Sequence, residues 1–195
     1  DEIINQSVPV TPTTVGSFAV NAKESQYRGI EVGWRWMPIE GFRLTGAYTH
    51  MDSQYIRFVD QFAAGGVITR VNQSSRQVPS VEKNVLNMKA AYEHATSGLG
   101  AWVEGSWVDS FYVNNNNTLG APSYVLLNAN LHHYYRPRNN RYVKFIKTYV
   151  EVDNLFDKAY VAWATPVADS VADANKQAFY AGVGRSAYVG VTLGF

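Results

Sequence analysis

The four histidines of the chain are its best candidates for holding a metal ion, because the sequence contains no cysteine. Only imidazole and oxygen ligands remain for such a site. His50, His94 and the pair His132 and His133 show no compact ligand spacing, and neighbouring residues of a strand point to opposite faces. A polar loop offers oxygens to calcium, without the spacing of an EF-hand, at Asp169, Asp173 and Asn175. We expect no resident metal or other cofactor.

Catalytic groups are not apparent either. The segment Gly182–Ser186 lacks the spacing and the lysine of a phosphate-binding loop, and a strand follows it. No Ser-His-Asp set or carboxylate pair can be assembled from spacing, so we expect no enzyme. With 17 basic and 16 acidic residues, the chain lacks the positive charge that attracts nucleic acid. The asparagines of residues 114–117 are expected to form a solvated loop tip.

Period-two alternation of apolar and polar residues predicts strands and no comparable helix. The seven alternating segments cover residues 27–37, 42–58, 84–94, 100–112, 123–134, 142–155 and 185–195. No apolar stretch approaches the roughly 20 residues of a membrane helix. Short connections alternate with long ones, and the long ones are 59–83, 113–122 and 156–184. This alternation is typical of outer-membrane β-barrels, which have short periplasmic turns and long extracellular loops.

The phase of the alternation separates a lipid-facing set from a lumen-facing set. Uncharged residues share one phase, such as Ile30, Val32, Trp34, Val125, Leu127, Leu131, Val189 and Val191. The central strand charges share the other phase, at Glu31, Arg35, Arg43, Lys89, Glu93, Glu104, Lys147, Glu151 and Asp153. A cation that faces lipid at the bilayer midplane costs about 2–4 kcal/mol, so this consistency supports a membrane barrel. Trp102 and Leu126 fall in the lumen phase, and the parity drifts near Asn154, where a bulge would account for it.

The C-terminal third carries the most specific pattern. Its residues are Asn154, Leu155, Phe156 and Asp157, then Tyr160, a long loop, Gly184 and Arg185, and a last strand that ends at Phe195. This order resembles the C-terminus of TonB-dependent receptors, in which an Asn-Leu-Phe-Asp-like turn and a Tyr follow the penultimate strand. The segments 27–31 and 41–48 are similar to the strand-turn-strand pattern of the same family. Phe195 resembles the terminal aromatic residue that the barrel-assembly machinery recognises.

The resemblance implies an all-β fold: an antiparallel transmembrane barrel of 22 strands, of which this chain supplies about seven C-terminal strands. Residues 1–26 are expected to form an extracellular loop and strand entry, and residues 27–195 the strands of the barrel. A plug domain and about fifteen strands would come from an N-terminal remainder outside this chain. An open sheet would leave unpaired edges in hydrocarbon, so seven strands cannot close a barrel.

The resemblance also implies a function in the bacterial outer membrane. Such receptors import an iron-siderophore complex, energised by the TonB-ExbB-ExbD system, and contact membrane lipid and lipopolysaccharide. Haem, cobalamin, other metal chelates and oligosaccharides remain alternative cargoes. The long loops offer aromatic rings for stacking and guanidinium groups for an anionic chelate, at Tyr55, Phe62, Arg70, Arg76, Trp163, Phe179 and Tyr180.

Two soluble folds also fit alternating strands. A seven-stranded β-sandwich acting as a binding or adhesion module would show the same period, but it needs no interfacial aromatic residues. A lipocalin-like carrier needs eight strands. A requirement for detergent during extraction separates the membrane barrel from both.

Overall fold

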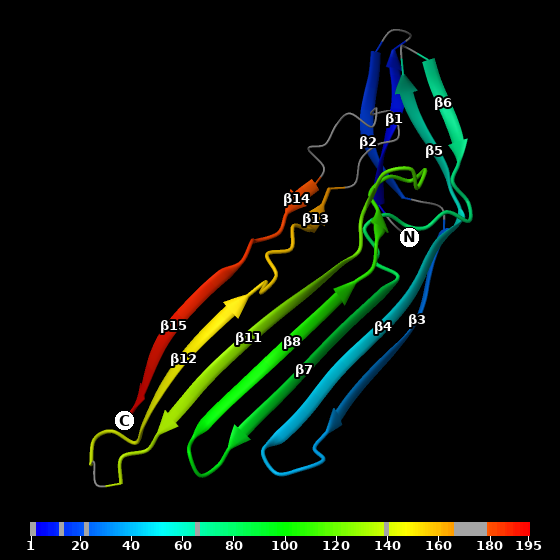
Figure 1. The fold of residues 1–195 in the computed structure, drawn as a ribbon. Helices are drawn as coiled ribbons and strands as arrows, with labels where there is room; N and C mark the ends of the chain where they lie inside the picture. The colour runs from blue at the N-terminus through cyan, green and yellow to red at the C-terminus, as the bar shows by residue number, and fades with distance from the viewer. Residues whose placement is uncertain (1–2, 12–13, 22–23, 65–66, 139–140, 166–178) are drawn as a thin grey trace.

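The large sheet of the chain is antiparallel and contains seven strands. The computed structural model describes residues 3–11, 14–21, 24–64, 67–138, 141–165 and 179–195, with side chains described from residue 24 onward except in 62–68. The order of strands across the sheet is β15-β12-β11-β8-β7-β4-β3 (Figure 1). Their bounds are β3 Glu24–Trp36, β4 Phe42–Arg57, β7 Asn84–His94, β8 Leu99–Val108, β11 Tyr124–Tyr135, β12 Phe145–Asp153 and β15 Ser186–Gly194.

These seven strands confirm the seven predicted segments, with shifted ends. The segment predicted over 100–112 divides into β8 and the short β9 (Phe111–Tyr112). The bulge considered near Asn154 is wrong: the β12–β15 register is regular from Phe145 paired with Gly194 to Asp153 paired with Ser186. The chain instead turns at Asn154, whose φ is 50°.

The long connections contain structure that the sequence did not predict. Along the chain, β5 (Val59–Ala64) and β6 (Val67–Asn72) form a hairpin in the connection from β4 to β7. In the connection from β12 to β15, β13 (Val161–Ala164) pairs with β14 (Phe179–Ala181). β9 pairs with β10 (Gly120–Ala121). Within residues 1–26, β1 (Ile3–Thr11) and β2 (Thr14–Asn21) form a further hairpin, and β1 contacts β5 and β6. All these hairpins gather at one end of the large sheet, opposite the short turns and the C-terminus (Figure 1).

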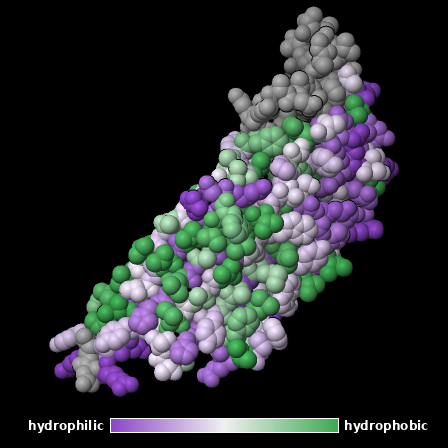
Figure 2. Space-filling view, viewed as in Figure 1, coloured by the Kyte–Doolittle hydropathy of each residue, from purple (hydrophilic) through white to green (hydrophobic). Residues whose placement is uncertain are grey.

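The register gives the sheet two different faces. Directly paired residues of antiparallel strands lie on the same face. Val32 pairs with Tyr48, Leu131 with Val150, and Val150 with Val189, so the uncharged phase continues across neighbouring strands. Lys89 pairs with Glu104, and Asn130 with Glu151, on the other face. Figure 2 shows hydrophobic residues gathered over the middle and lower sheet, with hydrophilic residues dense near the long connections.

Exposure of the apolar face is high. Ile30, Val189 and Val191 are 66%, 80% and 64% exposed, although the hydrophobic effect would normally bury such residues. Among the described residues, the two outer strands β3 and β15 pair on one side only. The described residues contain no helix long and apolar enough to cross a membrane, a finding that does not concern strands.

Spin labels on the two faces test the orientation of the sheet in a bilayer. Labels at Ile30, Val125 and Val189 in the complete protein should collide with oxygen dissolved in the hydrocarbon, because these residues share the uncharged face. Labels at Glu31 and Asn128 serve as controls and should favour a water-soluble relaxer. The reverse pattern of accessibility would contradict the assignment of the two faces.

Candidate functional site

The asparagine-rich segment 114–117 ties two long connections together, so its prediction as a solvated loop tip is wrong. Asn114 is buried, and Asn115 accepts a hydrogen bond from the Tyr55 hydroxyl at 3.0 Å while its Nδ2 donates to Asp60. Asn117 exchanges two hydrogen bonds with the backbone of Gln77, at 2.8 and 2.9 Å. The connection between β8 and β11 thus fixes the connection between β4 and β7 through side-chain amides, which can donate and accept at once.

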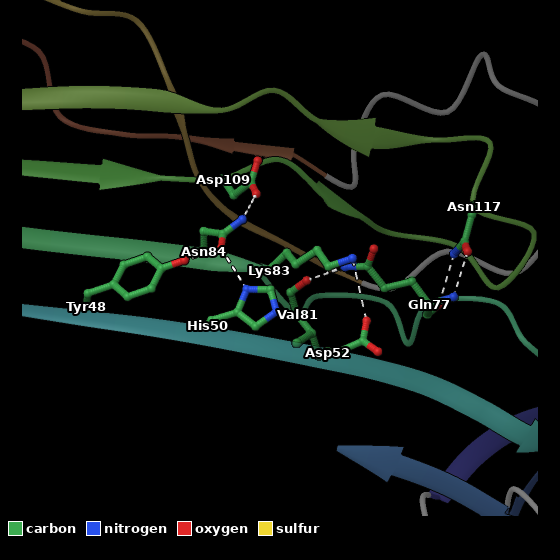
Figure 3. A network of polar contacts seen from close by, with 9 residues as sticks. All are labelled: Tyr48, His50, Asp52, Gln77, Val81, Lys83, Asn84, Asp109 and Asn117. Atoms are coloured by element: carbon green, nitrogen blue, oxygen red, sulfur yellow. Dashed lines mark hydrogen bonds and ion pairs between the residues drawn. The ribbon is translucent and has the colours of Figure 1, made fainter. Parts of the chain in front are cut away.

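A second network anchors these connections to the sheet (Figure 3). The Oδ1 of Asn84 accepts from the Tyr48 hydroxyl at 2.7 Å and lies 2.8 Å from the Nδ1 of His50, and its Nδ2 donates to Asp109 at 2.7 Å. The middle of β4, the first residue of β7 and the residue that follows β8 thus meet at this one amide. The loops therefore begin from a fixed base, which reduces the conformational freedom that a bound ligand would have to remove.

Two small apolar clusters support the loops from within. Tyr55, Phe58 and Val78 form one cluster. The other consists of Phe111, Val113, Ala121 and Ala164, with Phe179 packed against it. Of the predicted ligand contacts, Tyr55 is only 1% exposed and Phe179 packs against buried residues. The structure therefore places Tyr55 inside a loop core, where it has little surface to offer a ligand, and Phe179 at the partly buried edge of the second cluster.

The other predicted ligand residues lie apart from these cores. Trp163 and Tyr180 are 55% and 50% exposed, and their ring centroids are 4.7 Å apart across the β13–β14 hairpin. Arg70 is exposed on β6 and donates to Gln61 at 3.1 Å. The guanidinium of Arg76 donates to the backbone carbonyl of Asn116. The side chain of Phe62 lies outside the described residues.

The Asn154 turn joins four segments of the chain. Asn154 is 4% exposed, its Oδ1 accepts from the backbone N–H of Lys158, and its Nδ2 donates to the carbonyls of Lys158 and Val183. Its own N–H donates to Asn128 on β11. The left-handed φ of 50° suits asparagine better than most other residues. Asn154 thus links β11, the end of β12 and the approach to β15.

The remaining residues of this motif complete the link. The Oδ1 of Asp157 accepts from the N–H of Arg185 at 2.8 Å, and a Cβ on Gly184 would lie 3.2 Å from the same oxygen. The N–H of Leu155 donates to Leu127. Tyr160 packs against Tyr124 with ring centroids 4.7 Å apart. Phe156 and the terminal Phe195 are 76% and 73% exposed. The motif is a structural clamp at the long-loop end of the last three strands.

The polar face carries a hydrogen-bonded chain that crosses three strand boundaries. The Nδ2 of Asn130 donates to Glu151 at 2.8 Å, which orients the Asn130 Oδ1 toward the Nδ1 of His132, 2.8 Å away. The Nε2 of His132 lies 2.9 Å from Glu93. Both ring nitrogens thus face acceptors, and a neutral imidazole has only one N–H. The ring of His132 therefore lies between the amide oxygen of Asn130 and the carboxylate of Glu93.

Gly100 makes the contact between Glu93 and His132 geometrically feasible. The two residues stand on β7 and β11, and β8 lies between these strands. Gly100 of β8 pairs with both of them, and a Cβ there would lie 2.3 Å from a Glu93 oxygen and 2.4 Å from the His132 Nε2. Without a side chain at this position, the two neighbours meet above the strand.

Trp102 has a place on the same polar face, as its phase predicted. The Nζ of Lys89 lies 3.7 Å from the centroid of the Trp102 ring and 3.1 Å from Glu104. The ring therefore supplies a π face to a cation that is also ion-paired. Among the described residues, no group of three or more His, Asp or Glu side chains is arranged to hold a metal ion.

Comparison with known proteins identifies the family. The profile of the family described as TonB dependent receptor-like, beta-barrel matches residues 1–155. The chain belongs to this family. Its members are outer-membrane β-barrels of Gram-negative bacteria, and this chain is a portion of such a barrel, as the resemblance of its C-terminal motifs implied.

Individual relatives agree with the family. A curated protein of Acinetobacter baumannii, "Probable TonB-dependent siderophore receptor PiuA", is 26% identical over 159 residues, which are 80% of this chain and 19% of the relative. The crystal structure of the siderophore receptor PiuA from Acinetobacter baumannii gives a TM-score of 0.66 at 24% identity, over 96% of this chain and 24% of that one. The ferric preacinetobactin receptor BauA from the same species gives 0.65 at 20% identity, over 98% and 26%. The chain thus spans about a quarter or less of these receptors.

Replacement of Asn154 tests the clamp of this TonB-dependent receptor. Asn154→Ala should lower the free energy of unfolding of the complete receptor by about 2 kcal/mol or more, because it leaves several buried backbone groups without partners. Asn87→Ala is the matched control, since Asn87 is exposed and accepts a single hydrogen bond from Ser106. Urea unfolding followed by gel mobility measures both. Equal losses in the two variants would contradict the role of Asn154.

Gly100→Ala tests the contact that crosses β8. The added methyl group should separate Glu93 from His132 and cost about 1–2 kcal/mol of unfolding free energy, at the lower end of charged hydrogen bonds because Glu93 is half-exposed. Gly33→Ala is the control on the same face, where a Cβ would meet nothing closer than 3.9 Å. In a Glu93→Gln background the cost of Gly100→Ala should shrink. An unchanged cost would show that the methyl group acts by another route.

Proposed function

We propose that this chain forms the C-terminal strands and several extracellular loops of a TonB-dependent transporter that imports a ferric siderophore. The observation that carries the proposal is the match to the family, together with a curated relative described as a probable siderophore receptor. In this proposal residues 1–26 lie outside the cell and residues 27–195 line the barrel. An N-terminal remainder supplies the plug and the other strands, and the TonB-ExbB-ExbD system acts through it.

The proposed ligand surface includes only some of the candidate residues from the sequence. Trp163 and Tyr180 are the rings best placed for stacking, because they are exposed and adjacent. Of the two candidate arginines, Arg70 is the exposed one. Tyr55, Phe179 and Arg76 act in our proposal by holding the loops in shape, through their burial, packing and backbone contact. Haem, cobalamin and oligosaccharides are the alternative cargoes that a transport assay distinguishes.

We propose that the chain has no enzymatic activity and no resident cofactor. The iron-siderophore complex is cargo. Two other proposed partners contact different ends of the barrel. Lipopolysaccharide would meet the long-loop end, and the barrel-assembly machinery would bind the exposed Phe195 at the last strand.

Ligand titrations of the complete receptor test the function. Ferric catecholate, hydroxamate and carboxylate siderophores should include one that binds and is taken up only in cells with TonB. Trp163→Ala should weaken its binding about two- to tenfold by loss of stacking, and Arg70→Ala about tenfold by loss of a charge-assisted hydrogen bond. Trp36→Ala and Arg57→Ala are matched controls at other exposed sites. Uptake of haem or cobalamin instead of every siderophore would contradict the proposed cargo.

A further inference from the structure

The connection between β11 and β12 is unusually basic for a turn of this sheet. It carries Arg136, Arg138, Arg141 and Lys144, and no Asp or Glu occurs anywhere from residue 134 to residue 150. Among the described residues, none of these four cations forms an ion pair with a carboxylate. The other two short connections differ: residues 37–41 contain Glu40 and no cation, and residues 95–98 contain no charge.

The position of this turn relative to the apolar face suggests what it meets. On β11 the apolar face runs through Val125, Leu127 and Leu131, and then changes to His133 and Tyr135. Tyr135 pairs with Ile146, which pairs with Leu193, so the rim of the face crosses the last three strands at one level. Tyrosines gather where hydrocarbon gives way to headgroups. The residues beyond this rim would therefore lie at the level of lipid phosphates.

Three of the four cations are available at this level. Arg138, Arg141 and Lys144 are all exposed. The N–H of Lys144 donates to the carbonyl of Gly194 at 2.7 Å, so the extended pairing with β15 reaches it, and Lys144 shares the parity of lipid-facing Ile146. Arg136 is different, because its guanidinium lies over the Tyr134 ring, 5.5 Å from the centroid, on the polar face.

We propose that Arg138, Arg141 and Lys144 form a binding site for the phosphate groups of acidic phospholipids in the periplasmic leaflet. Short turns of outer-membrane barrels lie on the periplasmic side. Unpaired cations just beyond a membrane interface attract anionic lipid headgroups. Exposed Tyr135 and Tyr142, at 56% and 76%, flank the cations and provide rings for the same interfacial layer. The site is independent of the cargo that the receptor imports.

Native mass spectrometry of the complete receptor in detergent, titrated with phosphatidylglycerol or phosphatidylcholine, tests the site. The unaltered receptor should retain phosphatidylglycerol preferentially. The variant Arg138→Gln/Arg141→Gln/Lys144→Gln should bind it roughly tenfold or more weakly, because each cation near a lipid surface contributes severalfold to binding. The variant Arg28→Gln/Arg57→Gln/Lys83→Gln removes the same charge at the long-loop end and should retain the preference.

Two further measurements keep the test decisive if the triple variant folds poorly. Arg141→Gln and Lys144→Gln should each weaken phosphatidylglycerol binding severalfold, whereas Arg138→Lys/Arg141→Lys, which keeps the charge, should bind nearly as well as the unaltered receptor. Equal binding of both lipids, or equal loss in the two triple variants, would overturn the proposal. Co-sedimentation with peptidoglycan that depends on these cations, without a lipid preference, would also overturn it in favour of the cell wall.

Discussion

The backbone of this chain must satisfy its own hydrogen bonds, because the interior of a bilayer offers no water to do so. Five strands of the large sheet have neighbours on both sides, and their N–H and C=O groups are paired throughout the apolar band. Among the described residues β3 and β15 have one neighbour each. An outer row of unpaired groups costs several kcal/mol per group in hydrocarbon, so these two strands require partners in the assembled barrel.

The same constraint explains why the charges in the central part of the sheet lie on one face. Alternation places Lys89 and Glu104 opposite each other, with Trp102 beneath the ammonium, and places Glu93, His132 and Glu151 in a second group. The ammonium and the carboxylate offset each other in the first group, and hydrogen bonds join the side chains of the second group. Sequence reasoning could predict which residues share the face, because the side-chain period of a strand is two.

The sequence predicted the seven strands well because each of them combines that period with a length sufficient to cross the bilayer. It did not predict the hairpins β5–β6 and β13–β14, which are short and have no lipid face to impose alternation. Burial of Tyr55 and the bonding of residues 114–117 depend on contacts between separate loops. No local pattern encodes such contacts, so the sequence alone does not distinguish these polar residues from solvated ones. The Asn154 motif was recognisable by its order, but the four segments that it joins were not.

Gly100 shows most clearly what the sequence alone could not predict. In the sequence it is one small residue of an alternating strand, and only the register of three strands reveals that Glu93 and His132 meet above it. Once those pairs are formed, the cations Arg35, Arg43 and Lys147 and the anion Asp153 remain without ion-pair partners among the described residues. A charge that faces a water-excluded interior needs a partner to offset its desolvation. Whatever fills the lumen of the assembled barrel must therefore present carboxylates or water to Arg35, Arg43 and Lys147, and cations or water to Asp153, while the groups around Gly100 already satisfy each other.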